Sequence, residues 1–464
     1  MSNNDMQKTK LKEPKQKKTK HKKAKQKKPY SKLRKLLLAA EILFTVFIVS
    51  ILVVLYVPTV KAAVVKAVTG SQIGRSIISY FGQQSYDDSV YDADFDETLI
   101  KTNDNLSTKY TSEEYTNFVI FGIDSRTSQF DDSTLSDSIL IVSMNNNTGE
   151  VNICSVYRDT FFEIQHNDGS ITYNKVNAAY SSGGAVAALS TLNTNLDLEI
   201  TDYVVVNFAG VEKIIDELGG IEVNLTDGEV AQINKHMKST ILNTGSAYSP
   251  VSSSGENITL NGTQAVTYCR IRKTTFYDPD TGEAINDDYG RAARQRLVVA
   301  KLVEKAKKLG VSEIINIMEL ILDSNTEDSK IISTSFTLDE LLEMVPVVFN
   351  FELSGSEGFP FDLTTKMING GSCVVPADLE SNVVSLHKYL YDDDDYQPTS
   401  TVSEISSYIS SYTGIYVSSS STDDSDSSES DSGDSDSDET DSETVADTYT
   451  GDYDYDDGGI SDLY

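Results

Sequence analysis

An apolar segment near the start of the chain limits where everything after it can lie. Residues 36–57 are hydrophobic apart from Glu41, Thr45 and Ser50. At about 1.5 Å per residue, a helix of this length rises about 33 Å, enough for a hydrocarbon core about 30 Å thick. A cleaved signal peptide is the alternative, but such peptides have a short basic start and an apolar region of about 7–15 residues. We therefore predict one uncleaved transmembrane helix over residues 36–57.

Charge predicts the orientation of this helix. Residues 1–35 hold 15 Lys and Arg against two acids, a charge of +13 in a chain whose net charge is -32. Basic flanks stay in the cytoplasm, so we expect a cytoplasmic arm over residues 1–35 and an extracellular position for the residues after 57. The arm can also attract nucleic acid. A membrane lipid surface is the favoured partner, and we expect no nucleic-acid partner.

Composition divides the extracellular part. Residues 58–112 show no sustained period and predict a stalk, whereas residues 113–310 carry most of the strand and helix patterns. Residues 311–390 predict a C-terminal helical part, with helices over 313–322, 338–347 and 378–390. Residues 391–464 predict a disordered acidic tail, because residues 392–464 hold 22 Asp and Glu and no Lys or Arg. Three cysteines in 464 residues exclude a disulfide scaffold.

Periodicity predicts the fold class of the core. The apolar runs 118–123, 138–144 and 151–156 predict three buried strands. Apolar residues at i, i+3, i+4 and i+7 predict helices over 211–218 and 299–309. Strands over 203–208 and 221–225 flank the first helix. This alternation predicts an α/β fold, an α-β-α sandwich with a mixed central sheet.

The ends of the first three strands carry acidic and basic residues. If consecutive strands pair as a meander, Asp124, Asp137 and Arg158 meet at one end of the sheet, where open α/β sheets bind ligands. Two carboxylates there suit Mg²⁺, which binds one or two carboxylates together with phosphate oxygens. The alternative is that these carboxylates cap helices or pair with arginines.

Basic residues gather later in the core. Arg270 and Arg272 share a face if their segment is extended. Arg291, Arg294 and Gln295 open the last clear helix, and Arg291 and Gln295 lie on the ridge that continues into its apolar face. A solvated basic face is the alternative. Four Arg and one Gln within 26 residues of an acidic protein instead favour a phosphate or pyrophosphate site.

These motifs, in this order, resemble those of the LytR–CpsA–Psr family of cell-envelope proteins over about residues 116–310. The matching segments are 121–126, 136–137, 155–159, 175–180 with Gly183-Gly184, 207–208, 218–221, 260–262, 268–272, 288–291 and 294–296. The resemblance implies a membrane-anchored phosphotransferase of a Gram-positive-type envelope. Such an enzyme moves a teichoic acid or capsule-like glycopolymer from a polyprenyl-pyrophosphate carrier to peptidoglycan. A membrane-anchored regulator and a non-catalytic glycolipid-binding module are the alternatives.

The resemblance also implies roles for individual residues. Asp124 and Asp137 would hold Mg²⁺, Asp159 would orient Arg158, and Asp288 would orient arginines or deprotonate the acceptor hydroxyl. An apolar gap between sheet and helices would hold the lipid tail. The family usually has Arg two residues before the second Asp, where this chain has Leu135. The phosphate contacts would come from Arg158, Arg270, Arg272 and Arg291, with Gln295 beside them. Arg126 and Arg294 are further candidate substrate-binding residues.

Overall fold

The computed structural model describes residues 95–107, 114–124, 134–310, 330–336 and 352–416, with residues 313, 316, 317, 320 and 340 between them. The predicted cytoplasmic arm, the segment 36–57 and Arg126 lie outside the described residues, as do most of the predicted helices 313–322 and 338–347. Within the described part of the chain, no helix has the length and apolar character needed to span a bilayer.

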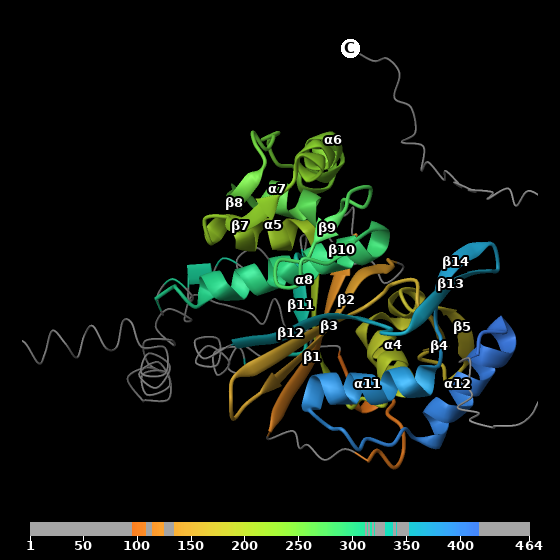
Figure 1. Ribbon diagram of the computed structural model, residues 1–464. Helices are drawn as coiled ribbons and strands as arrows, with labels where there is room; N and C mark the ends of the chain where they lie inside the picture. The colour runs from red at the N-terminus through yellow and green to blue at the C-terminus, as the bar shows by residue number, and fades with distance from the viewer. Residues whose placement is uncertain are drawn as a thin grey trace, which may run out of the picture. The chain divides into compact units, whose positions relative to one another are not determined.

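A six-stranded mixed sheet forms the centre of the fold, in the order β11-β6-β1-β2-β3-β12 (Figure 1). β1, β2 and β3 pair antiparallel as the predicted meander, whereas β6 runs parallel to β1 and β12 parallel to β3. Its strands are β1 (Tyr115–Ile123), β2 (Ser136–Asn145), β3 (Glu150–Val156), β6 (Asp202–Asn207), β11 (Ile332–Thr334) and β12 (Glu352–Phe359).

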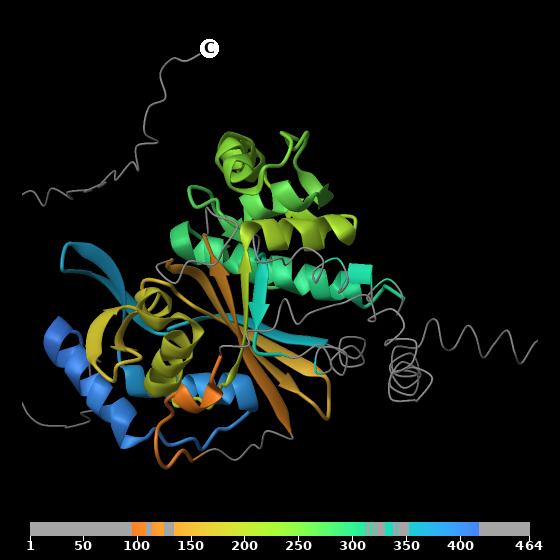
Figure 2. The same ribbon diagram turned by 180° about the vertical axis from the view of Figure 1, so that it is seen from behind.

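Alternating side chains of the sheet supply two cores. On β1, Val119 and Phe121 face one core while Phe118 and Ile120 face the other, because successive strand residues point to opposite faces. The first core is covered by α4 (Ala178–Leu196), α11 (Leu379–Tyr391) and α12 (Ser400–Thr413). The second is covered by α8 (Asp287–Ala306), as Figures 1 and 2 show. The predicted α-β-α sandwich with a mixed sheet is confirmed.

A third, smaller core lies beside α8. It is formed by α5 (Phe208–Glu217), β7 (Ile221–Leu225), α6 (Asp227–Thr244), β8 (Gly255–Leu260) and α7 (Gly262–Tyr268). The predicted strand over 221–225 is present, but it pairs with β8 outside the central sheet. Gly220 permits this turn: its φ is +86°, and a Cβ there would lie 2.6 Å from the carbonyl oxygen of Leu260.

Three hairpins and one short helix complete the described structure. They are β4 (Phe161–Gln165) with β5 (Ile171–Lys175), β9 (Phe276–Tyr277) with β10 (Ala284–Ile285), β13 (Leu363–Ile368) with β14 (Gly371–Pro376), and η1 (Glu97–Leu99).

Two sequence predictions are wrong in the C-terminal part. The segment predicted as helical, 311–390, contains the strands β11 to β14 before the confirmed helix α11. The segment predicted as disordered from residue 391 contains α12, whose Val402, Ile405 and Ile409 are buried in the first core. Their i, i+3, i+7 spacing lies within a Ser-rich segment whose composition obscures it.

Candidate functional site

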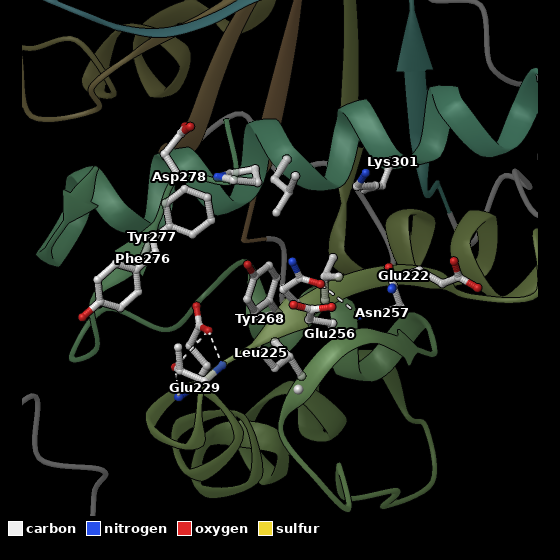
Figure 3. A pocket seen from close by; sticks show the side chains of 16 residues that line it. Glu222, Leu225, Glu229, Glu256, Asn257, Tyr268, Phe276, Tyr277, Asp278 and Lys301 are labelled. Atoms are coloured by element: carbon white, nitrogen blue, oxygen red, sulfur yellow. Dashed lines mark hydrogen bonds between the residues drawn. The ribbon is translucent and has the colours of Figure 1, made fainter. Parts of the chain in front are cut away.

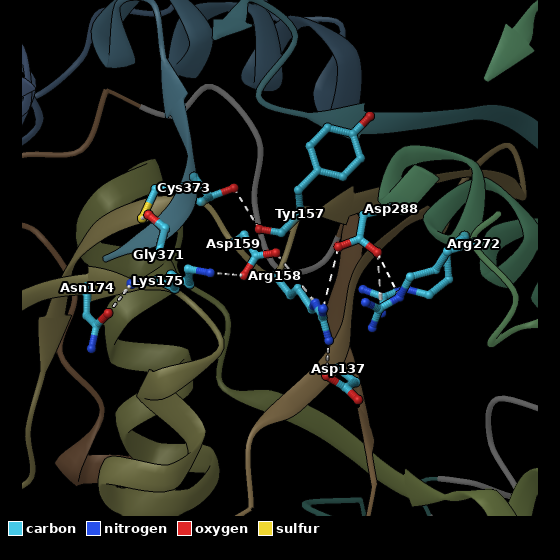
Figure 4. A network of polar contacts seen from close by, with 12 residues as sticks. Asp137, Tyr157, Arg158, Asp159, Asn174, Lys175, Arg272, Asp288, Gly371 and Cys373 are labelled. Carbon is cyan, nitrogen blue, oxygen red and sulfur yellow. Dashed lines mark hydrogen bonds and ion pairs between the residues drawn. The ribbon is translucent and has the colours of Figure 1, made fainter. Parts of the chain in front are cut away.

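The meander brings a carboxylate and a guanidinium together at one end of the sheet. β1 ends at Ile123, opposite Ser136, where β2 begins, so Asp124 and Asp137 lie at the same end. β3 returns the chain to this end, and Nη1 of Arg158 lies 2.6 Å from Oδ1 of Asp137. The predicted meeting of Asp137 with Arg158 is confirmed (Figure 4).

The first turn of α8 adds Asp288 to this pair. Oδ1 of Asp288 lies 3.0 Å from Nε of Arg272 and 3.6 Å from Nη1 of Arg291. Oδ2 lies 3.5 Å from Nη2 of Arg158. A carboxylate in the first helical turn also faces the positive end of the helix dipole. Asp288 therefore joins guanidinium groups from three separate segments of the chain.

Asp159 and Lys175 extend the network on its other side. Nζ of Lys175 lies 2.9 Å from Oδ1 of Asp159, and Oδ2 of Asp159 lies 3.7 Å from Nε of Arg158. This geometry agrees with the predicted orienting role of Asp159. Lys175 was not predicted as a site residue, because one Lys at the end of a short polar strand carries no distinctive pattern. We call the following seven residues the ion cluster: Asp137, Arg158, Asp159, Lys175, Arg272, Asp288 and Arg291.

The ion cluster carries more positive than negative charge. Its four cations face three carboxylates, a local charge of +1 in a chain of -32. Burial alone would raise the pKa of Asp288, but Arg291, Arg272 and Arg158 together hold it below the usual range. Burial, with the neighbouring charge of Arg158, lowers the pKa of Arg291 to about 10. Nε of Arg291 is buried and has no hydrogen-bond partner among the described residues. Such a donor in an under-neutralised cluster favours a bound anion.

Asp124 and Arg270 contact helix α6. Nδ2 of Asn243 donates to Oδ1 of Asp124 at 3.3 Å, and Nη1 of Arg270 donates to Oγ1 of Thr240 at 3.0 Å. Thr240 and Asn243 are three residues apart and share one face of the helix. The guanidinium of Arg270 also lies over the ring of Phe208, 4.7 Å from its centroid. Of these three partners, only Phe208 lies in a segment that the sequence motifs had marked.

Other predicted site residues have different placements. Arg270 donates to α6 whereas Arg272 pairs with Asp288, so the expected common face of the two arginines is not the arrangement found. Arg294 is fully buried, with Nε 3.0 Å from Oε1 of Glu229 and Nη2 donating to the carbonyl of Thr274 at 3.0 Å. These contacts give Arg294 a counter-charge of its own inside the protein, and its predicted phosphate contact stays a prediction.

Gln295 contributes indirectly. Its Nε2 donates to the carbonyl oxygen of Cys269 at 3.3 Å, next to Arg270 in the chain. Gln295 therefore fixes the segment that leads to the two arginines.

The carboxylates at the strand ends are oxygen donors, which suit hard divalent cations such as Mg²⁺. Among the described residues, no three His, Cys, Asp or Glu side chains come together as a metal site. The two carboxylates of Asp124 and Asp137, from adjacent strand ends, instead suit Mg²⁺ that completes its coordination with phosphate oxygens and water.

The cysteines supply no nucleophile in this region. Cys154 and Cys269 are free thiols and form no disulfide with each other. Burial raises the pKa of each thiol to about 12, so both stay protonated at neutral pH.

A separate pocket of about 500 Å³ lies between the paired strands β7 and β8, the β9–β10 segment and α8 (Figure 3). Tyr268, Phe276 and Leu297 line it together with Glu222 and Lys301. None of the predicted site residues lines this pocket, so it is distinct from the ion cluster.

Comparison with known proteins agrees with the fold and the motifs. A model of the LytR_cpsA_psr family matches residues 79–380. The chain is 26% identical over 276 residues to the polyisoprenyl-teichoic acid–peptidoglycan teichoic acid transferase TagU of Bacillus cereus, covering 59% of this chain and 77% of that protein. It is 30% identical over 228 residues to TagU of Enterococcus faecalis, covering 48% and 62%.

Among solved structures, TagT of B. subtilis matches with a TM-score of 0.43 and 17% identity, covering 68% of this chain and 99% of that one. The family model spans well over half of the 464 residues. The chain therefore belongs to the LytR–CpsA–Psr family.

Proposed function

We propose that this protein is a phosphotransferase that moves a teichoic acid or capsule-like glycopolymer from a polyprenyl-pyrophosphate carrier to peptidoglycan. The observation that carries the proposal is the ion cluster, in which Arg158, Arg272 and Arg291 converge with a net positive charge and a buried, unpaired donor. The transferase names of the two TagU relatives support the same substrates.

Transfer of this kind needs charge stabilisation more than a covalent nucleophile. The acceptor hydroxyl oxygen forms a bond to the phosphorus that carries the glycopolymer, the bridging P–O bond of the pyrophosphate breaks, and polyprenyl phosphate leaves. The guanidiniums of Arg158, Arg272 and Arg291 are placed to stabilise the charge that develops on the phosphate oxygens. The hydroxyl proton goes to a base.

Asp288 is a poor candidate for that base. Three guanidiniums contact it and lower its pKa, so it holds a proton weakly at neutral pH. Between its two predicted roles, the geometry favours orientation of the arginines. Asp124 and Asp137 are the residues that would hold Mg²⁺, which supplies Lewis-acid stabilisation of the phosphate oxygens when bound.

The proposed substrates require a particular location. A polyprenyl carrier lies in the membrane and peptidoglycan lies outside it, so we place the catalytic domain outside a membrane anchor at residues 36–57. Protease treatment of intact cells tests this topology. Cleavage within the catalytic domain supports it, and cleavage confined to residues 1–35 contradicts it.

The test of the activity is a single charge deletion with a matched control on helix α8. Arg272→Gln removes one guanidinium from Asp288, and we expect transfer from a lipid-pyrophosphate glycan to peptidoglycan, with Mg²⁺ present, to fall by at least about 100-fold. Lys301→Gln removes the same charge from an exposed pair with Glu304, and we expect transfer within about twofold of the wild type.

The outcomes separate the candidate functions. Equal transfer by the wild type and Arg272→Gln refutes the site. Binding of the lipid-pyrophosphate glycan without turnover, with or without Mg²⁺, identifies a glycolipid-binding module. Loss of transfer after chelation, restored by added Mg²⁺, supports the metal.

A further inference from the structure

Helix α12 carries two exposed aromatic side chains beyond the part of the chain that the family model matches. It spans Ser400–Thr413, beyond the family match that ends at residue 380. Its inner face is buried in the first core, but Tyr408 and Tyr412 on its outer face are 43% and 51% exposed. Large aromatic side chains on the outer face of a surface helix mark an interaction surface when they lie together.

The two rings lie flat on the β4–β5 hairpin. Tyr408 stacks on Tyr173 with centroids 3.9 Å apart and planes at 26°, and Tyr412 stacks on Phe161 at 5.6 Å and 16°. The planes of Tyr408 and Tyr412 differ by only 12°, with centroids 5.8 Å apart. The hairpin thus supports both rings from one side and holds them nearly parallel. We call Tyr408 and Tyr412 the tyrosine platform.

The chemistry of this face selects among partners. The exposed residues of α12 between 403 and 412 are Glu404, Ser407, Tyr408, Ser411 and Tyr412. Only one of them is charged, although the whole chain has a net charge of -32. No basic residue is present there to attract a phosphate polymer or an anionic lipid surface. Tyr and Ser together offer rigid apolar faces surrounded by hydroxyls, which suits an uncharged partner with apolar faces and many hydroxyls. Sugar rings have this chemistry.

The platform is continuous with the ion cluster. Phe161, which supports Tyr412, is two residues after Asp159 and pairs in register with Lys175. At about 3.3 Å per strand residue, the support begins about 7 Å along the chain from the Asp159–Lys175 pair. The aromatic support of Tyr412 therefore begins at the same end of the hairpin as the Asp159–Lys175 pair of the cluster.

We propose that the tyrosine platform binds sugar rings of the acceptor glycan by stacking and leads that glycan to the ion cluster. This inference rests on the proposed function for the identity of the acceptor. The platform itself is a carbohydrate-binding surface, and its two tyrosines lie after residue 380, where the family match ends.

The experiment measures co-sedimentation of the full-length protein with insoluble peptidoglycan from which other polymers have been removed. Tyr408→Leu/Tyr412→Leu keeps apolar bulk on the hairpin but removes the flat rings, and we expect binding at least about tenfold weaker. Tyr408→Phe/Tyr412→Phe keeps the rings and should bind within about threefold of the wild type. Tyr248→Leu/Tyr277→Leu is the matched control, because these tyrosines are 53% and 57% exposed elsewhere, and it should bind as the wild type does.

A second measurement uses only the wild-type protein and so does not depend on the folding of a variant. Soluble β-1,4-linked N-acetylglucosamine oligomers should release the bound protein from the peptidoglycan, whereas a glycerol-phosphate polymer of equal mass should not. Undiminished binding of the Leu double variant, or no release by the oligomers, overturns the proposal.

The two proposals fail in different ways. Arg272→Gln should lose transfer and keep peptidoglycan binding, because Arg272 lies in the ion cluster and outside the platform. If Arg272→Gln loses transfer while the Leu double variant still binds, the platform is wrong and the activity stands. If the Leu double variant loses binding while Arg272→Gln transfers normally, the assignment of transfer to the ion cluster is wrong and the glycan-binding surface stands.

Discussion

Replacement of Asp288 by Asn tests the charge balance of the ion cluster most directly. Asn keeps the shape of the side chain but removes the one negative charge shared by Arg158, Arg272 and Arg291. The cluster then holds four cations and two carboxylates, so its local charge rises from +1 to +2. The variant should be less stable than the wild type, because three guanidiniums lose their common partner.

The magnitude follows from burial. Removal of one partner from a fully buried ion pair costs about 3–5 kcal/mol. The side chain of Asp288 is 35% exposed, so solvent screens part of this loss and we expect about 2 kcal/mol. A loss of this size lowers Tm by about 4–8 °C in a domain of about 150–250 residues, and we expect the lower end in this larger domain.

The assay is thermal unfolding with and without inorganic pyrophosphate, compared with chloride at equal ionic strength. At about 100 times its Kd a ligand stabilises the folded state by about 2.7 kcal/mol, enough to offset the loss. Pyrophosphate should raise Tm more in Asp288→Asn than in the wild type, because the variant has the larger positive charge. The exposed carboxylate of Glu304, also on α8, provides the control Glu304→Gln, with an expected change below about 0.5 kcal/mol.

The pH dependence has a defined sign. The folded protein holds the pKa of Asp288 below its ordinary value, so its stabilising effect is present above about pH 4 and is lost as pH falls further. The difference in Tm between variant and wild type should shrink below about pH 4. A variant as stable as the wild type at neutral pH, with no response to pyrophosphate, would refute the anion-binding role of the cluster.

Three further measurements test other parts of the structure. Glu229→Gln leaves Arg294 buried without its counter-charge and should cost about 3–5 kcal/mol in urea unfolding, while a loss below 1 kcal/mol would contradict the buried pair. Burial lowers the pKa of His387 to about 4, whereas His387 in the unfolded chain takes up a proton near pH 6.5. The free energy of unfolding should therefore fall by about 3 kcal/mol as the pH is lowered from about 6.5 to about 4. His387→Gln should flatten that pH profile of Tm, and an unchanged slope would assign it to other groups. A chain that ends at residue 398 lacks α12 and should have a much lower Tm than one that ends at residue 416, because each fully buried aliphatic side chain contributes about 1.5–3 kcal/mol. Equal Tm values would show that α12 adds nothing to the core.

The central part of the fold was predictable because its signals are local and strong. The apolar runs of β1, β2 and β3 are long enough to require burial on both faces, and the short turn between β2 and β3 favours an antiparallel pair. The meander then determines that Asp137 and Arg158 meet. Sequence periodicity thus predicted the contact between two of the seven residues of the ion cluster through topology alone.

Other elements depend on tertiary contacts that no local pattern reports. β12 carries Ser and Gly residues and pairs with β3 from far along the chain, so it lacks a strand signature of its own. The helix α12 is amphipathic, but its outer Ser and Tyr residues resemble the composition of the acidic segment that follows. Its attachment to the core depends on Asp197, which is buried at the end of α4 and accepts hydrogen bonds from the backbone and hydroxyl of Thr399.

Arg291 and Arg294 show that the position of the counter-charge, and not the sequence spacing, determines the role of a buried arginine. Both are buried on α8, three residues apart, and sequence spacing gives them the same expected role. Glu229 pairs with Arg294 in the small core, so the counter-charge for that guanidinium is already present. Arg291 shares Asp288 with two other arginines. Each of the two residues has one buried nitrogen without a hydrogen-bond partner among the described residues, so the counter-charge is what distinguishes them. A buried cation with a partner of its own has little to gain from an external anion, whereas one that shares its partner gains the full electrostatic benefit. The phosphate is therefore expected at Arg291 and not at Arg294, although one turn of helix separates them.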